Sequence, residues 1–348
     1  MSVQTLALIA SNLATLFEDR IATNINRAVV LSQLLPVKDG TGKNLSWIAR
    51  FGTATPSGAV IADGADVTVY NSDTKVPCTL DYGTYHDAFG VTGKARSGAA
   101  ISGNPQELED LYGEEIEESV TRLASAIGVD LYTGSGASDT IMGLTATNGP
   151  LQATGTYANV ARATYTQWAS NVLSNGGVER PISIPLMRQM RRTIYTASGT
   201  KPDLIVCDPV QHEKYGALFG DQRRYLQSVN LRGEKIVLDG GYQVLEFDGI
   251  PVVEDVNCPA GQMLFLNTRY LAIRPLPHAP DAVNQGAGMI ALHGTEEEQM
   301  GEPKDVLTAR INPLAITGDA YKFQLICYPQ LQSRRCNVHG RLTDLETA

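Results

Sequence analysis

The residues whose types and spacing come closest to chemistry lie between positions 203 and 213. Five polar or reactive side chains gather there, at a predicted junction between a strand and a helix: Asp203, Cys207, Asp208, His212 and Glu213. Ligands and nucleophiles often lie where a strand of an α/β protein ends. Because a thiol beside a histidine base can act as a nucleophile, Cys207 and His212 are the candidate pair of a cytoplasmic α/β enzyme.

A structural interpretation of the same residues fits the local pattern better. The stretch "PDLIVCDPVQHEKYGALFG" predicts a buried strand over Leu204–Cys207, followed by a helix that Gly220 ends. Asp208 has the type and position of an N-cap, and Pro209 suits the first helical residue. Cys207 is then the last apolar residue of a strand, and His212 lies on an outward helical turn. We therefore favour packing over catalysis here.

Motifs for cofactors and metals are missing from the sequence. "GTGKN" and "GVTGKA" lack the glycine and the Ser/Thr of a phosphate loop, and no GxSxG, HExxH or GxGxxG motif occurs. The five cysteines contain no CxxC pair, so we expect reduced thiols rather than a zinc or redox site. These observations predict no cofactor, no metal and no catalytic residue.

The bulk composition excludes two further classes of protein. The formal net charge is −9, whereas domains that hold nucleic acid by neutralising phosphates are usually basic. No apolar run approaches the ~20 residues that a membrane-spanning helix needs. With 43% hydrophobic and 19% charged residues, the chain has the composition of a folded globular protein.

A helix of unusual length is predicted over residues 104–132. Asn104 suits the N-cap, Pro105 the first helical position, and Glu107 completes a pattern like a capping box. At 1.5 Å per residue the helix is about 40 Å long. Its apolar stripe recurs every three or four residues, and acidic residues crowd its first half, where the helix dipole favours them.

A long hairpin arm is predicted before this helix. Residues 45–51 and 75–92 have strand character, whereas 52–73 contain few large apolar side chains. Paired antiparallel, such an arm reaches roughly 60 Å at ~3.3 Å per residue. Because its middle buries too little surface to fold on itself, we expect it to lie on another molecule. An amphipathic helix ending near Arg27 precedes the arm.

The second half of the chain predicts mixed helices and strands. We expect helices over 164–176 and 184–198, and a hairpin over 242–255 with Asp248-Gly249 as its turn. A second hairpin is predicted over 262–275 around Asn267-Thr268. A loop-dominated crossing over 275–305 and a final strand or two complete the chain.

Charged residues fall into separate acidic and basic groups. Arginines occur in clusters at 188–192, 223–224 and 334–335, without interleaved aromatic residues that would favour nucleic acid. Pairing with carboxylates of a neighbouring copy fits the net charge better. The candidate contacts between subunits are therefore Arg50, Asp63, Asp66, Lys75, Glu114, Glu117, Glu118, Arg188, Arg191, Arg192, Arg223 and Arg224.

The order of these parts resembles the major capsid protein family of tailed bacteriophages, whose fold is shared by encapsulins. The resemblance covers essentially the whole chain and is strongest at "PDLIVCDPVQHEKYGAL" and "GGYQVLEFDGIPVVEDVNCPAGQMLFLNTRYLAIR". It implies an α+β fold divided as follows: an N-terminal arm over 1–44, an extended E-loop over 45–92, a peripheral domain over 93–132 and 285–330 with the spine helix 104–132, and an axial domain over 133–284 that 331–348 can rejoin.

The resemblance also implies a structural function. Such a protein is not an enzyme; its copies form pentamers and hexamers of an icosahedral shell around double-stranded phage DNA. The implied partners are other copies, a separate scaffolding protein, a portal, a possible decoration protein and non-specifically contacted DNA. The shell would be assembled in the bacterial cytoplasm and belong to the virion. Two alternatives stay open: an encapsulin shell and the Cys207/His212 enzyme.

Overall fold

The computed structural model describes residues 30–52, 63, 74–94, 97, 105–218, 228–231, 234–237, 245–277, 289–291, 307–314 and 319–347. The amphipathic helix predicted to end near Arg27 lies outside these residues. So does the predicted low-apolar middle of the hairpin arm, apart from Gly52 at its edge and an exposed turn at Asp63.

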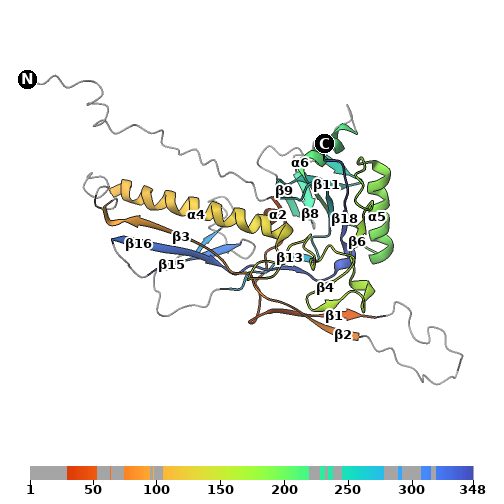
Figure 1. Ribbon diagram of the computed structural model, residues 1–348, viewed down its shortest axis with the longest axis horizontal. Coiled ribbons are helices and arrows are strands. Elements are labelled where there is room, and N and C mark those ends of the chain that lie inside the picture. The colour runs from red at the N-terminus through yellow and green to blue at the C-terminus, as the bar shows by residue number, and fades with distance from the viewer. Residues whose placement is uncertain are drawn as a thin grey trace, which may run out of the picture.

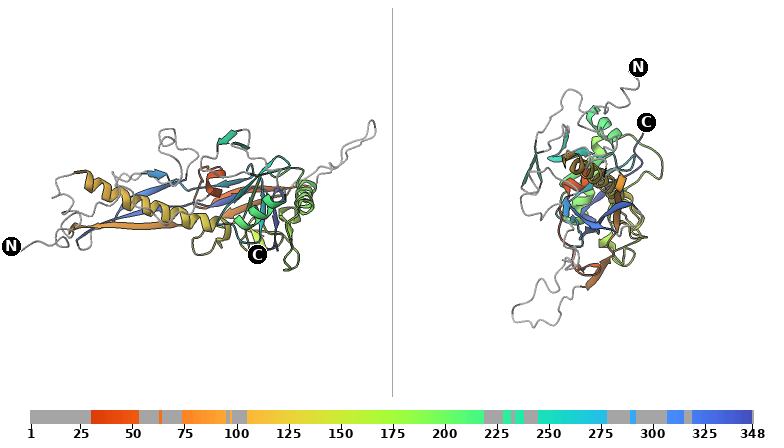
Figure 2. Two further views of the ribbon diagram at one scale, coloured as in Figure 1. Left: turned by 90° about the horizontal axis from the view of Figure 1, so that it is seen from above. Right: turned by 90° about the vertical axis from the view of Figure 1, so that its left-hand side faces the viewer.

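The molecule is elongated, with a long helix and a sheet at one end and a second, larger sheet at the other (Figures 1 and 2). The long helix, α4, spans Pro105–Thr133, within one residue of the predicted boundaries. It lies along a four-stranded antiparallel sheet in the order β14-β15-β16-β3. The strands span Met289–Ala291, Thr308–Pro313, Ala320–Cys327 and Tyr85–Thr92.

Helix α4 is attached to β3 by both packing and polar contacts. Its apolar stripe buries Leu123, Ile127 and Leu131 in the main core. On the same side, Asp87 of β3 accepts a hydrogen bond of 2.7 Å from the Ser119 hydroxyl and one of 3.0 Å from Arg122 Nε. The second half of the helix is therefore fixed to the sheet by its own chain.

The other end of the molecule is a six-stranded mixed sheet in the order β10-β11-β7-β12-β18-β6. The central strand β7 is fully buried, runs parallel to β11 and antiparallel to β12, and matches the predicted strand at Leu204–Cys207. The remaining strands span Leu245–Phe247, Ile250–Glu254, Met263–Leu266, Gly340–Leu342 and Asn171–Leu173.

Two helices pack against this sheet. Helix α5, Ile184–Ser198, is the predicted helix; Ser183 accepts a hydrogen bond from Leu186 N, and Gly199 ends the helix at φ 70°. Helix α6 spans Pro209–Ala217 with Asp208 at its N-cap position, as predicted. It ends before Gly220, which lies outside the described residues.

Close packing explains a glycine in β18. A Cβ at Gly340 would lie 2.6 Å from both the Met190 sulfur and the Ile194 Cδ1 of α5. A larger residue would therefore displace the ends of these two side chains from their places in the core.

The base of the hairpin arm consists of β1, Leu45–Phe51, and β2, Thr74–Leu80, paired antiparallel as expected. Leu45, Ala49 and Cys78 pack with Tyr157 and Trp168 in a separate apolar cluster. The predicted second strand over 75–92 is too long, because strand β2 ends at Leu80. Residues 85–92 form β3 and pair with β16 instead.

The helix predicted over 164–176 is also wrong. The segment instead forms a short 3-10 turn, η1 (Thr166–Trp168), and the strand β6. Strand β6 pairs in parallel with β18. The side chains of Ser170 and Asn171 both donate to the His339 carbonyl, at 3.1 and 3.0 Å. Long-range pairing with the end of the chain therefore overrides a local helical pattern.

One predicted hairpin is confirmed and the other is wrong. β10 and β11 form a hairpin whose turn residues Asp248 and Gly249 have φ of 50° and 83°, the signs of a type I′ turn. Over 262–275, by contrast, β12 pairs with β7 and β18, whereas β13 (Leu271–Ile273) pairs with β17 (Leu331–Ser333). Asp203 binds Thr268 N and Oγ1, both at 2.8 Å, and so holds a bend that sends the chain to another sheet.

Short elements complete the described fold. The crossing expected over 275–305 contains strand β14, and the final segment contains more strands than expected. The remaining elements are α2 (Val30–Leu34), β4 (Thr156–Tyr157), β5 (Val160–Ala161), β8 (Ser228–Leu231), β9 (Glu234–Val237) and η4 (Cys336–Val338).

Candidate assembly surfaces

The cluster around Cys207 has no catalytic arrangement. The Cys207 thiol is buried and points to the Val253 carbonyl at 3.7 Å, and burial raises its pKa well above the ordinary value. A nucleophilic cysteine needs the opposite, a lowered pKa and access. His212 Nδ1 lies 3.3 Å from the Glu254 carboxylate, and Asp203 holds the bend at Thr268. These side chains therefore support the end of β7 and the start of α6.

The described residues contain no metal site and no membrane-spanning helix. Within the described ranges, no three His, Cys, Asp or Glu side chains gather in a way that could hold a metal ion. No described helix is long and apolar enough to cross a membrane. All five cysteines are buried and free of disulfides, as the sequence predicts.

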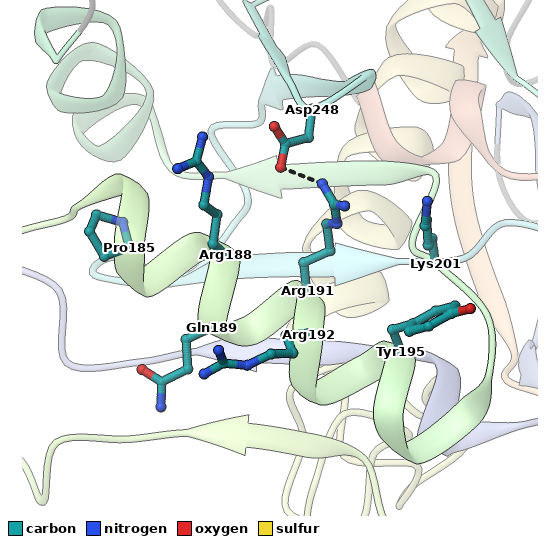
Figure 3. Close-up of a pocket in the computed structure, with 8 residues that line it drawn as sticks. All are labelled: Pro185, Arg188, Gln189, Arg191, Arg192, Tyr195, Lys201 and Asp248. Carbon is teal, nitrogen blue, oxygen red and sulfur yellow. Dashed lines mark hydrogen bonds and ion pairs between the residues drawn. The ribbon is translucent and has the colours of Figure 1, made fainter.

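The outward face of α5 forms an open, basic groove of about 820 Å³, shown in Figure 3. Met187, Met190 and Ile194 face the sheet, so the residues between them face away from it. The groove is lined by Pro185, Arg188, Gln189, Arg191, Arg192, Tyr195, Lys201 and Asp248. Arg188, Arg191 and Arg192, which are close together in the sequence, therefore lie on one continuous surface.

The α5 groove has more positive charges than its own carboxylate can match. Asp248, at the β10–β11 turn, forms an ion pair with Arg191. Among the described residues that line the groove, it is the only acid against four cations. Figure 3 shows Arg188 and Lys201 pointing to the same side as that pair. Guanidinium groups have the donor geometry to bind carboxylates in pairs, so the groove suits an anionic partner.

The acidic half of α4 has the opposite charge. Glu117 is exposed, and Glu118 forms an ion pair of 2.7 Å with Arg122, one turn further along the helix. Arg122 is also bound to Asp87, so this cation is already shared. The backbone of Glu114 lies in the same helix, while its side chain is outside the described residues. The first half of α4 therefore carries excess negative charge.

The base of the hairpin arm presents a third charged group. Arg50 and Lys75 lie directly opposite each other across β1 and β2, and both are exposed. Like charges in such a pair repel, which an acidic neighbour would relieve. Asp63 lies in an exposed turn of the arm. Asp66, Arg223 and Arg224 are outside the described residues.

The sequence analysis does not predict two charged side chains of the α5 groove. Lys201 follows the glycine that ends the helix, and Asp248 is 57 positions away from Arg191 along the chain. Because Lys201 is only two residues beyond Gly199, its place near the basic face of the helix could have been predicted from the sequence. The approach of Asp248 depends on the tertiary fold and leaves no local pattern.

Comparisons with known proteins identify the family and the fold of the chain. The family model described as SU10 major capsid protein matches residues 20–297, which is well over half of the chain. The chain belongs to the SU10 major capsid protein family. A search of curated proteins by sequence found no match.

Solved structures show the same fold. The capsid protein of cyanophage A-1(L) superposes with a TM-score of 0.73 at 23% identity, over 98% of each chain. The SrpI encapsulin of Synechococcus elongatus superposes at 0.57 with 12% identity, over 100% of this chain and 98% of that one. The capsid of phage XM1 superposes at 0.53 with 11% identity, over 97% and 98%. The predicted α+β capsid fold is thus confirmed.

Family membership decides among the functions that the sequence left open. This member of the SU10 family is a major capsid protein of a tailed phage, forms an icosahedral shell and resides in the virion capsid. It is a structural protein and not an enzyme, in agreement with the buried Cys207 thiol. The encapsulin shares its fold.

Proposed function

We propose that copies of this chain form pentamers and hexamers, that the shell encloses double-stranded phage DNA, and that the charged surfaces described above join neighbouring copies. In this proposal residues 1–44 are an N-terminal arm and 45–92 an E-loop. Residues 93–132 and 285–330 are the peripheral domain, and 133–284 with 331–348 are the axial domain.

The observation that carries this proposal is the α5 groove. Three of its four cations have no carboxylate among its described lining residues, although the whole chain has a net charge of −9. An excess of cations on an acidic protein is expected where another acidic molecule docks. Other copies of this chain are such molecules, and a shell brings many of them together.

Basic and acidic surfaces lie on different parts of the elongated molecule: helix α5, which carries the α5 groove, lies at one end, and the acidic half of α4 lies towards the other (Figures 1 and 2). A contact between a basic surface of one copy and an acidic surface of another leaves the first copy with a free acidic surface and the second with a free basic surface, so each can bind a further copy. Such heterologous contacts close into rings when the rotation between copies allows it, which is the geometry of a pentamer or hexamer. Exposed charge pairs are individually weak, so many copies and many contacts are needed for a stable shell.

We further propose separate helper proteins and weak contact with DNA. A scaffolding protein, a portal and a possible decoration protein would guide and complete the shell. The acidic composition favours non-specific, loose contact with the packaged DNA, because like charges repel. A strong, salt-sensitive affinity of the purified chain for DNA would contradict this part of the proposal.

Charge reversal in the α5 groove tests the proposed contacts. The full-length double variant Arg188→Glu/Arg192→Glu should remain a folded protein but form far fewer particles in electron micrographs. The matched control Arg188→Lys/Arg192→Lys keeps the charge and should assemble, although with weaker bidentate contacts. Normal particle yield from the Glu variant would show that the α5 groove joins no copies.

A further inference from the structure

A second basic concavity lies between the base of the hairpin arm and the body of the molecule. Its volume is about 640 Å³. Four arginines line it, and no Asp or Glu is among the described residues of its lining. We call it the arginine groove and define it by Arg50, Arg269, Arg334 and Arg335.

The arginine groove is built from segments that are far apart in the sequence. Arg269 follows the bend at Thr268, Arg334 directly follows β17, and Arg335 is the N-cap residue of η4. The backbone N–H of Arg334 donates to the Tyr270 carbonyl at 2.9 Å, which joins two of these segments. The backbone positions of these arginines are therefore determined by the tertiary fold.

Arg335 is held in place by neutral groups. Its Nε donates to the Asn337 side chain at 2.9 Å and its Nη2 to the Ser198 carbonyl at 2.7 Å, while its guanidinium lies 5.8 Å from the centre of the Tyr270 ring. Arg269 and Arg334 are exposed. In the described part of the chain, none of these three arginines has a carboxylate within ion-pair distance.

The positive surface continues beyond the groove. A smaller hollow shares Arg269 and Arg334 and adds Lys38 and Arg274. Burial, and then the charge of Arg334, lower the pKa of Arg274, so the cations are close enough to repel one another. The Arg274 side chain donates to two neutral oxygens, the amide oxygen of Gln332 at 2.9 Å and the main-chain carbonyl of Asp39 at 3.0 Å. A partner with several carboxylates would relieve this repulsion.

The rim of the arginine groove favours a protein over nucleic acid as that partner. Ile48 lies on the rim and is 68% exposed, which provides an apolar contact beside the charges. Single-stranded nucleic acid needs open aromatic faces on which its bases stack, whereas the ring of Tyr270 is already faced by Arg335. The net charge of −9 also opposes a polyanion.

We infer that the arginine groove binds the acidic first half of α4, around Glu115–Glu118, of a second copy of this chain. This inference rests on the proposed function, in which copies join through charged surfaces. Glu117 is exposed there, and the nearby Arg122 is already shared between Asp87 and Glu118. The first half of α4 points away from the base of the arm along the elongated molecule, so one chain does not make this contact with itself (Figures 1 and 2).

Charge reversal and its compensation test the pairing in the full-length chain, expressed together with the phage's other head proteins. Arg269→Glu/Arg334→Glu should reduce the yield of particles at least about tenfold, because the reversal replaces attraction by repulsion at every copy of the contact. Adding Glu115→Lys/Glu117→Lys to the same chain should restore much of that yield. Lys43→Glu, a reversal at an exposed position outside the groove, is the matched control and should assemble normally.

A disulfide between copies tests their proximity independently. Arg334→Cys and Glu117→Cys chains are mixed, assembled and oxidised; a disulfide-linked dimer of the two variants is expected. Replacing Arg334→Cys by Lys43→Cys should give no such dimer. The native cysteines do not interfere, because all five are buried.

The outcomes separate this inference from the proposed function. A wild-type chain that stays monomeric at every concentration, with the other head proteins present, overturns both. Normal particles from Arg269→Glu/Arg334→Glu together with no disulfide-linked dimer overturn the inference alone. Normal particles that lose their DNA would assign the groove to nucleic acid and also overturn it. If the reversal variant does not fold, Arg269→Gln/Arg334→Gln replaces it with the same expected result.

Discussion

Asp255 and the two basic grooves differ in how the chain surrounds a polar or charged side chain. Asp255 is buried, yet its Oδ2 accepts from Leu31 N at 3.2 Å and from the Tyr132 hydroxyl at 2.7 Å, and its Oδ1 from Asn257 N at 2.9 Å. The grooves instead expose several arginines with few described carboxylates beside them. The chain satisfies the first region by itself, whereas for the second we propose a neighbouring copy as the partner.

This difference separates folding from assembly. Asp255 directly follows β11 and binds α2 and the end of α4, so its hydrogen bonds attach the long helix to the six-stranded sheet. Arg188, Arg192, Arg269 and Arg334 are exposed and can change without disturbing a core. Substitutions in the first region should therefore act on stability, and those in the second on assembly.

The largest effect on stability is expected at Asp255. Asp255→Ala leaves the Leu31 N–H, the Tyr132 hydroxyl and the Asn257 N–H without their acceptor, at a cost of about 3 kcal/mol or more in the free energy of unfolding. Chemical denaturation of the unassembled chain measures this loss. Asp255→Asn keeps an acceptor oxygen and should lose less; equal losses would show that the hydrogen bonds are not what matters there.

A pH-dependent effect is expected at His339. The imidazole is fully buried, and burial lowers its pKa to about 3, from an ordinary value of 6.5. Because the unfolded chain binds the proton more readily, the contribution of His339 to stability is complete above pH 6.5. It is lost as the pH falls from 6.5 towards 3, at up to about 1.4 kcal/mol per pH unit.

The histidine also accepts a hydrogen bond from Asn267 N at Nδ1 and contacts the Ser333 hydroxyl at Nε2. His339→Gln should lower stability at pH 7 but lose less of it between pH 7 and 5 than the wild type does, by about 2 kcal/mol. Denaturation curves at the two pH values measure this difference. Parallel losses in both proteins would place the acid sensitivity elsewhere.

A smaller effect on stability is expected at Cys207 and His212, the candidate catalytic pair of the sequence. Cys207→Ala removes one buried sulfur and should cost about 1–2 kcal/mol, and His212→Ala a similar amount, because the His212 side chain is only 13% exposed. Both variants should still form particles, since neither residue lies in a groove. Loss of particles from folded Cys207→Ala protein would contradict the purely structural role.

The smallest effect on stability is expected in the α5 groove. Arg188→Glu/Arg192→Glu should change the free energy of unfolding by about 0.5 kcal/mol or less, because exposed charges contribute little to folding. Its effect on assembly should nevertheless be the largest of the substitutions in this series. A loss of stability as large as that of Asp255→Ala would remove the distinction between the two regions.

Local sequence patterns predict those parts of the fold that local physics determines. The extent of α4, the strand Leu204–Cys207 and the turn Asp248-Gly249 all depend on nearby residues, and all three are confirmed. Residues 164–176 and 262–275 were predicted wrongly. Their structure depends on partners more than 60 positions away, His339 for the first and Asp203 for the second.

The same limit applies to the assembly surfaces. The cluster Arg188, Arg191 and Arg192 is visible in the sequence because its members share one helical face. The arginine groove is not, because Arg50, Arg269 and Arg334 come from three distant segments. The pair Arg334–Arg335 is apparent as a basic pair, yet only the fold shows that it faces the base of the arm.

The most direct test is a cryo-electron microscopy map of particles assembled from the full-length chain. The map should show an icosahedral shell in which carboxylates of neighbouring copies occupy the α5 groove and the arginine groove. A shell in which both grooves face solvent would contradict the separation of folding from assembly. A chain that forms no particles with its phage partners present would contradict the shell itself.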